Sequence, residues 1–353
     1  MALDEAAEAA SEAGLLYVTD EAPGIRRVRR GRGFSYLRPD GVIVQDERER
    51  ARIKEIAIPP AWTEVWICPR PDGHILATGR DARGRKQYCY HPKWRESRDG
   101  TKFHRLRTFG ELLPDLRASL ERDLLRPGLP PEKVLALVVR LLDETLIRVG
   151  NPEYATANET YGLTTLGAEH VEVSSSRVVF DFNGKGGAPR QVALPDRRLA
   201  RLVKECHELG GRELFTYEDE AGARSAVGSD DVNDYLRALT GEDFSSKDFR
   251  TWGGTSVATE ALGGMGAADD EDQAESNILS AIDQAAEKLG NTRAVCRDSY
   301  VHPAVPEAYR DGRLIARWKS TRAGQRMGRN ERTVLAILPA KRPGRRSGRA
   351  PGR

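Results

Sequence analysis

Apolar and polar residues alternate along much of residues 31–93, a pattern typical of half-buried β-strands. The longest such stretch is EVWICPRPDGHILATGRDARGRKQYCYHP, in which the turn signals PDG and GRDARGR separate short apolar runs. The pattern predicts a small domain of short, mostly antiparallel strands.

The period becomes helical near residue 100. In PEKVLALVVRLLDETLIRVG the apolar positions follow one face of a helix, and the prolines before it suit a helix start. Residues 178–182 and 191–194 then flank the glycine-rich turn NGKGG, which predicts a β-hairpin. Beyond the hairpin, helices are expected as far as about residue 289, with a loop at GGMGAADDEDQAE.

These patterns predict an α+β fold with a small β-rich domain and a larger, mainly helical domain that contains one β-hairpin. The expected parts are an acidic leader, flexible or weakly helical, at 1–22; the β-rich domain at 23–99; the helical domain at 100–309; and a basic extension at 310–353, disordered from about residue 340.

Charge is distributed unevenly, although the whole chain carries a formal net charge of only +3. Residues 1–22 hold six acidic and no basic side chains, residues 23–107 hold 21 basic and ten acidic, and residues 310–353 hold 14 basic and two acidic. Two basic segments that flank an acidic middle point to nucleic acid as a partner. An anionic membrane and a merely solvated surface are the alternatives.

Simpler features exclude several classes of protein. The sequence has no run of about 18 apolar residues, so no transmembrane span is expected. The leader lacks the basic start of a secretory signal. The four cysteines form no Cys-x-x-Cys pair, so neither a zinc site nor a disulfide framework is expected. Together these features predict a cytoplasmic protein without a bound metal.

Four charged side chains stand out against the pattern. Arg148 is expected to end an apolar helix just before Gly150, where a cation can simply stabilise the helix dipole. Lys185 lies at the tip of the predicted hairpin, where a solvated lysine is an ordinary turn residue. Arg250 is expected in the first turn of a helix capped by Ser245 or Ser246, where a cation opposes the dipole, and Lys247 adds a second cation there. Such breaks of local rules tend to fall at functional sites.

Tyr300 lies in RDSYVHP, among polar and basic residues rather than in an apolar rhythm. Two arginines, a lysine and a tyrosine suit the transfer of a phosphodiester to the tyrosyl oxygen. Guanidinium groups favour the phenolate, whose ordinary pKa is about 10, and hold the phosphoryl oxygens as their charge grows. A lysine on a mobile hairpin can protonate the departing sugar oxygen.

The blocks LIRVGNPEYATANETYGLTTL, FNGKGG, KDFRTW and NTRAVCRDSYVHP resemble the active-site blocks of type IB DNA topoisomerases, in the poxvirus-like form found in bacteria. The segment GRDARGRKQYCYHPKW is similar to the DNA-recognition β domain of that family. The resemblance covers roughly residues 15–310. It implies that Tyr300 is the nucleophile, Arg148 and Arg250 are phosphate clamps, Lys185 is the general acid and Lys247 is its auxiliary.

The sequence departs from the family at one catalytic position. Where the family usually has a histidine, nine residues before the tyrosine, this chain has Asn291. An amide can still donate a hydrogen bond to a phosphoryl oxygen, but it cannot become positively charged, so a weaker contribution is expected. His302 follows the tyrosine by two positions and is expected to be structural.

The resemblance also implies contacts to DNA. Along the predicted strand, Arg85, Gln87 and Cys89 should share one face, and Tyr88 and Tyr90 the other. The alternative for either face is that it packs in the core of the domain. Arginine and glutamine suit base edges in the major groove. The DNA-contact residues implied by the resemblance are Arg85, Gln87, Tyr88, Tyr90, Asn151 and Tyr154.

The resemblance implies a nucleoid-associated DNA topoisomerase that acts as a monomer on duplex DNA. It would relax supercoils through a 3′-phosphotyrosyl intermediate, without ATP, metal, other cofactor, membrane or small-molecule substrate. Two alternatives stay open. A tyrosine recombinase has a similar catalytic domain but usually carries a histidine where this chain has Asp248. A non-enzymatic DNA-binding protein would keep the basic segments without needing Tyr300.

Overall fold

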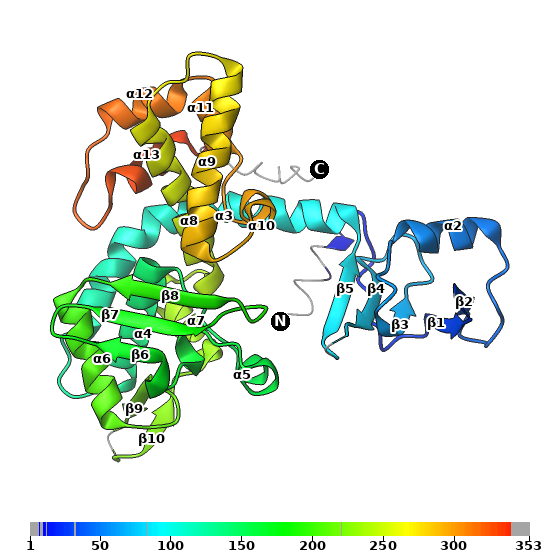
Figure 1. Cartoon of the computed structure of the whole chain (residues 1–353), viewed down its shortest axis with the longest axis horizontal. Coiled ribbons are helices and arrows are strands. Elements are labelled where there is room, and N and C mark those ends of the chain that lie inside the picture. The colour runs from blue at the N-terminus through cyan, green and yellow to red at the C-terminus, as the bar shows by residue number, and fades with distance from the viewer. Residues whose placement is uncertain are drawn as a thin grey trace, which may run out of the picture. The chain divides into compact units, whose positions relative to one another are not determined.

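The computed structural model describes residues 7, 10–11, 13–31, 33–82, 84–219 and 221–339. The chain divides into two compact units, residues 1–103 and 104–353 (Figure 1). Residues 340–353, expected to be disordered, lie outside the described residues. In the parts of the chain that are described, no helix is both long enough and apolar enough to cross a membrane.

The first unit is built on a five-stranded antiparallel sheet in the order β2-β1-β3-β4-β5. The β-rich prediction for this region is therefore confirmed. A helix that the alternation did not predict follows the second strand, and the Asp46 side chain caps it by accepting from two backbone N–H groups. The elements are β1 (Ile25–Arg30), β2 (Gly33–Leu37), α2 (Glu47–Glu55), β3 (Thr63–Ile67), β4 (Ile75–Arg80) and β5 (Lys86–Tyr90).

The acidic leader contributes to this unit. The backbone N–H of Leu16 donates to the Asp72 carbonyl (2.8 Å), and Leu16 in turn accepts from the His74 N–H (2.9 Å). The Asp20 carboxylate accepts from the Thr78 hydroxyl on β4 and from the Lys86 ammonium on β5. The leader thus lies along the sheet and neutralises one of its cations.

The second unit contains most of the helices. The helix α3 begins before residue 103 and ends after it, so the predicted boundary at 99/100 falls within a helix. The helices are α3 (Pro92–Asp123), α4 (Pro131–Thr145), α5 (Pro152–Asn158), α6 (Arg197–Leu209), α7 (Ser229–Thr240), α8 (Ser246–Met265), α9 (Glu271–Leu289), α10 (Arg293–Ser299), α11 (Ala304–Arg310), α12 (Arg313–Ser320) and α13 (Arg329–Ile337).

The predicted hairpin is present as two strands of a three-stranded antiparallel sheet, β6 (Val171–Val173), β7 (Val178–Asn183) and β8 (Pro189–Leu194). In its register Phe182 faces Arg190, and Asn183 faces Pro189 beside the glycine-rich turn. A second small hairpin of β9 (Thr216–Glu218) and β10 (Arg224–Ala226) lies in a region that was expected to be helical.

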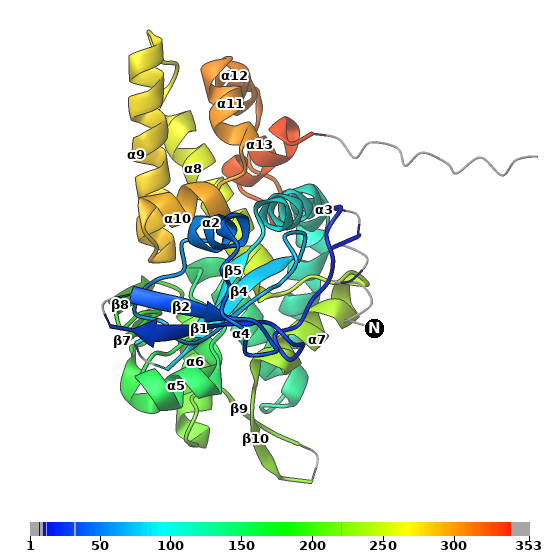
Figure 2. The same ribbon diagram turned by 90° about the vertical axis from the view of Figure 1, so that its right-hand side faces the viewer.

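The apolar face predicted for α4 is buried, with Val134, Leu137 and Leu142 each no more than 1% exposed. The helices α8 and α9 lie side by side in both views (Figures 1 and 2). Their apolar residues form a core with α10 to α13 that includes Ile278, Val301 and Leu314. The segment after residue 310, expected as an extension, therefore supplies helices that pack on α8.

Candidate active site

Arg148 is held by the chain segment that leaves α4. The helix ends at Thr145, earlier than expected, because Leu146 takes a left-handed conformation (φ 55°). The Leu163 N–H donates to the Arg148 carbonyl at 2.9 Å. Gly162 allows this approach, since a Cβ there would lie 2.5 Å from the same carbonyl oxygen. Arg148 therefore projects from a fixed loop rather than from a helix end.

Arg250 lies in the second turn of α8 rather than in the first, because the helix begins at Ser246 with Ser245, one of the two serines predicted, as its N-cap. The residue is 4% exposed. One terminal nitrogen of its guanidinium donates to the Leu146 carbonyl and the other to the Leu289 carbonyl (3.0 Å). Burial lowers the pKa of Arg250 to about 10, and the positive charge of Arg148 acts in the same direction.

Asn291 connects the end of α9 to Arg148. Gly290 ends the helix in a left-handed conformation (φ 61°), and the Asn291 N–H donates back to the Ala286 carbonyl at 2.9 Å. The Asn291 side-chain oxygen accepts from an Arg148 terminal nitrogen at 2.6 Å. Because arginine can only donate, the amide oxygen must face it, and the amide nitrogen is left for another acceptor.

Two buried donors in this cluster lack a hydrogen-bond partner within the described part of the chain. They are Nε of Arg250 and Nδ2 of Asn291. A buried donor without an acceptor costs about 1–3 kcal/mol, so such groups are rare and call for an explanation. An anion with several oxygens would satisfy both donors and offset the mutual repulsion of the arginines.

Tyr300 follows α10, and its backbone packs on α8. The Thr255 hydroxyl donates to the Tyr300 carbonyl at 3.1 Å. A Cβ on Gly254 would lie 2.8 Å from that carbonyl oxygen, so only glycine fits there. The Arg250 guanidinium lies over the tyrosine ring, 5.1 Å from its centroid. One helix thus supplies an arginine and holds the tyrosine beside it.

Lys185 is exposed at the hairpin tip, between Gly184 and two glycines with positive φ. It lines a small pocket together with Arg148, Arg250 and Arg190. Arg190 was not singled out from the sequence, because a charged residue in a strand looks like an ordinary solvent-facing position. Three arginines and one lysine therefore line this pocket.

The remaining expected residues lie at different places. Lys247 is exposed in the first turn of α8, three residues before Arg250. Asn151 caps α5, where its side-chain oxygen accepts from the Glu153 N–H at 2.8 Å. Tyr154 lies on α5, and its side chain is outside the described residues. His302 is buried, and its Nδ1 accepts from the Ala304 N–H at 3.0 Å, which is a structural contact.

In the first unit, the expected DNA-contact residues lie in and beside β5. The Asp81 carboxylate accepts from Nε of Arg85 (2.8 Å) and from the Gln87 amide (3.0 Å), so it holds both side chains together. The rings of Tyr88 and Tyr90 stack at 5.7 Å with an interplanar angle of 10°. An arginine–glutamine pair and a tyrosine pair are thus presented by one strand.

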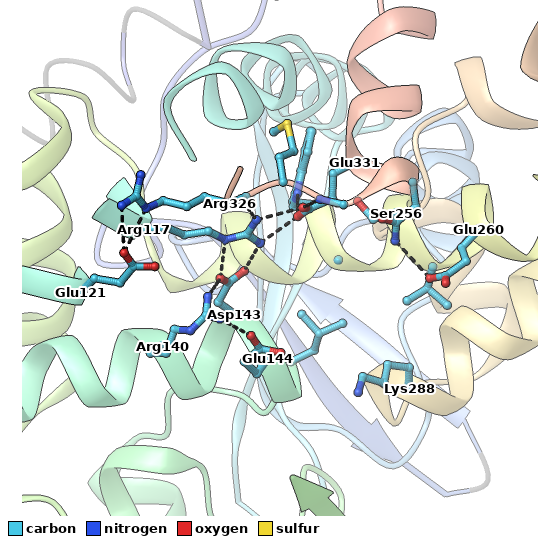
Figure 3. A pocket seen from close by; sticks show the side chains of 17 residues that line it. Arg117, Glu121, Arg140, Asp143, Glu144, Ser256, Glu260, Lys288, Arg326 and Glu331 are labelled. Carbon is cyan, nitrogen blue, oxygen red and sulfur yellow. Dashed lines mark hydrogen bonds and ion pairs between the residues drawn. The ribbon is translucent and has the colours of Figure 1, made fainter. Parts of the chain in front are cut away.

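A second cluster of charges lies on another side of α8 (Figure 3). Arg117 on α3 forms paired hydrogen bonds with Asp143 on α4 and with Glu331 on α13. Glu331 also accepts from the Trp252 indole on α8 at 2.9 Å. Burial alone would lower the pKa of Arg117, but the hydrogen bonds of these carboxylates raise it. The cluster joins four helices, and two of them position arginines of the pocket: α4 precedes Arg148, and α8 carries Arg250.

Comparison with known proteins gives two matching family models. Residues 91–325 match the catalytic core of eukaryotic DNA topoisomerase I, and residues 33–81 match the N-terminal domain of bacterial DNA topoisomerase IB. The chain is 31% identical over 295 residues to the DNA topoisomerase 1B of Acanthamoeba polyphaga mimivirus. The matched region covers 82% of this chain and 88% of the viral protein. The chain is 24% identical over 137 residues to the DNA topoisomerase 1B of Vaccinia virus (strain Copenhagen), over 38% of this chain and 44% of that protein.

Proposed function

Because the chain belongs to the type IB DNA topoisomerases, we propose that it relaxes supercoiled duplex DNA by cutting and rejoining one strand through Tyr300. The observation that carries this proposal is the cluster of Arg148, Arg250 and Asn291 beside that tyrosine, with two buried donors left for an anion. A scissile phosphodiester is the anion that such a cluster fits.

In the first step the Tyr300 hydroxyl gives its proton to water, and its oxygen attacks phosphorus while the bond to the 5′ oxygen breaks. The products are a 3′-phosphotyrosyl link and a free 5′-hydroxyl end. Arg250 lies over the ring and favours the phenolate. Formation of a covalent enzyme intermediate divides one difficult exchange into two easier ones.

The transition state places additional negative charge on the non-bridging oxygens. Arg148 and Arg250 would hold these oxygens, with Asn291 donating a further hydrogen bond through its free amide nitrogen. Preorganised donors of this kind act most strongly where water is excluded, and one is typically worth about 10²–10³ in rate. Positive side chains can thereby supply the electrostatic stabilisation that divalent cations provide in other phosphoryl transfers.

Departure of the 5′ oxygen requires a proton, and we assign this role to Lys185, with Lys247 as an auxiliary in the same relay. The broken strand then swivels about the intact one, and the 5′-hydroxyl attacks the phosphotyrosine to reseal the strand. The phosphotyrosyl bond conserves the energy of the diester, so the cycle is proposed to need neither ATP nor a metal ion.

DNA contacts in this proposal come from both units. Arg85 and Gln87 would read base edges, and Tyr88 and Tyr90 would contact phosphates or base faces. Asn151 and Tyr154 would contact DNA near the scissile phosphate. One chain carries the whole catalytic set, so we propose that the protein acts as a monomer.

The test is the substitution Tyr300→Phe, which keeps the ring and its packing but removes the attacking oxygen. The variant should fold and bind duplex DNA with near-native affinity, yet relax no supercoiled plasmid in EDTA and form no covalent adduct. Tyr161→Phe is the matched control, because Tyr161 lines the same pocket and should be dispensable for the adduct.

In the unaltered protein, denaturant added during reaction should trap DNA on the peptide that contains Tyr300. Relaxation by Tyr300→Phe, an adduct elsewhere, or recombined products would contradict the proposal.

A further inference from the structure

Arg190 lines the pocket but has no role in the reaction proposed above. It lies on β8, directly across from Phe182 on β7, and five residues after Lys185 in the chain. The residue is half-buried, and its guanidinium is held by the backbone of another element. The two terminal nitrogens donate to the carbonyls of Glu287 and Lys288, each at 3.0 Å, although these residues are 97 and 98 positions away in the chain.

These carbonyls belong to the last turn of α9, at the negative end of the helix dipole. The Glu287 carbonyl also accepts from the Gly290 N–H at 3.1 Å. The next carbonyl, that of Leu289, accepts from Arg250. Two arginines thus share the end of one helix. Asn291, two residues further on, accepts from Arg148. The end of α9 is therefore the point to which all three guanidinium groups of the pocket are attached.

The two ends of the Arg190 side chain both meet glycines at close range. A Cβ on Gly184, the residue before Lys185, would lie 3.0 Å from Cγ of Arg190. A Cβ on Gly290 would lie 2.6 Å from a terminal nitrogen of the same side chain. Arg190 therefore fills the space between the hairpin tip and the end of α9, and any larger residue at Gly290 would displace it.

Burial lowers the pKa of Arg190, and the nearby positive charge of Arg148 lowers it further. A hairpin tip with three glycines is otherwise free to move, because glycine places little restriction on the backbone. The tight contacts of Arg190 with the rigid end of α9 oppose that freedom.

We propose that Arg190 is a positioning residue for the general acid: it fastens the hairpin that carries Lys185 to the end of α9. The ammonium of Lys185 is thereby kept within reach of the departing 5′ oxygen. This inference rests on the proposed function. Arg190 itself acts through Lys185 and makes no contact with the reacting atoms.

The experiment compares two short duplexes in single-turnover cleavage, one with the natural 5′ bridging oxygen and one with sulfur in its place. A thiolate leaves without a proton, so the sulfur duplex does not need the general acid. Arg190→Met retains the aliphatic stem but removes both hydrogen bonds. It should slow cleavage of the oxygen duplex by about 10- to 100-fold, a part of what a general acid contributes. On the sulfur duplex it should react within about threefold of the unaltered protein.

The double variant Lys185→Ala with Arg190→Met should be no slower on the oxygen duplex than Lys185→Ala alone, because both changes remove the same function. Arg177→Met is the matched control, since Arg177 is exposed beside β7 at the far end of the hairpin. It should leave both rates unchanged. If Arg190→Met does not fold, Arg190→Lys takes its place, because lysine lacks the fork that reaches two carbonyls.

Equal slowing on both duplexes would overturn the proposal, since it would mean that Arg190 acts on the phosphate. Unchanged cleavage of the oxygen duplex would also overturn it. Failure of the proposed function would look different, because the unaltered protein would then form no adduct through Tyr300 on either duplex.

Discussion

Asn291 determines how the pocket presents hydrogen-bond donors. Its oxygen is occupied by Arg148, and its nitrogen has no acceptor among the residues that the structure describes. The side chain therefore does two things at once, because it orients an arginine and offers a donor of its own. A neutral histidine could do both, whereas a protonated one would carry a positive charge and donate through both nitrogens but could no longer accept from Arg148.

We predict that Asn291→Ala slows single-turnover cleavage of a short duplex by about 10- to 1000-fold, the range for loss of one preorganised donor. Asn291→His should retain the rate or raise it. Asn291→Asp is the informative comparison, because it keeps the size and the contact with Arg148 but replaces the donor with a negative charge. It should be slower than Asn291→His. An unaltered rate for Asn291→Ala would give the residue a purely structural role.

At the scale of elements, α13 is joined to the helices of the site by one buried carboxylate. Glu331 is 8% exposed and accepts from Arg117, from the Trp252 indole and from the Gly328 N–H. Trp252 follows Arg250 by two residues on α8. The helix α13, which follows Tyr300 in the chain, therefore helps to hold α8, the helix that carries Arg250.

We predict that Glu331→Gln lowers the free energy of unfolding at neutral pH by about 1.5–3 kcal/mol, because the buried Arg117 loses one of its two charged partners and keeps only Asp143. Burial acts to raise the pKa of Glu331, but the hydrogen bonds from Arg117 lower it more, so the net shift is downward. A lowered pKa in the folded state gives stability that is present above about pH 4.3, the ordinary value, and disappears at lower pH. The difference between the two proteins should therefore shrink on acidification.

Urea unfolding across a pH series measures this difference. Glu208→Gln is the control, because the Glu208 side chain is 63% exposed and its Oε1 lies 3.5 Å from Nζ of Lys204 on the same helix, α6. Exposed pairs contribute about 0–1 kcal/mol. A destabilisation by Glu331→Gln no larger than that of the control would contradict the role given to the buried carboxylate.

The elements that the sequence predicted correctly are those whose residues carry their own local signal. The glycine-rich turn after β7, the serine cap of α8 and the apolar face of α4 all depend on neighbours in the chain. Leu146 was missed because nothing local prevents α4 from continuing to Arg148. Arg190 was missed because its partners are carbonyls 97 and 98 residues away, and no residue pattern marks a backbone acceptor.

At the scale of the whole molecule, basic and acidic residues are concentrated in different segments of the chain. Residues 340–353 alone carry five arginines and one lysine and no acidic residue. These residues follow α13 and lie outside the catalytic set proposed above. Their contribution is expected to be electrostatic attraction to DNA rather than chemistry.

We predict that deletion of residues 340–353 weakens duplex binding and flattens its dependence on salt. The slope should fall by about 0.9 units for each DNA phosphate that the shortened protein no longer neutralises. Cleavage of a short duplex at saturating protein should be unchanged. Replacement of the six cations by glutamine at constant length is the matched control and should reproduce the deletion. Absence of cleavage at saturation would show that the tail takes part in the reaction.

The two buried donors without an acceptor in the described residues, on Arg250 and Asn291, also bear on how this protein can be engineered. Each costs about 1–3 kcal/mol when it has no acceptor, so a substitution that removes the donor but keeps the other hydrogen bonds of the side chain removes a penalty from the folded state. Selection of variants by heat resistance alone would therefore favour changes at the very positions that the reaction needs. Natural sequences keep such unfavourable positions where activity depends on them. A mutant library made to raise thermal stability should therefore keep Arg250 and Asn291 unchanged and vary residues of the surface helices.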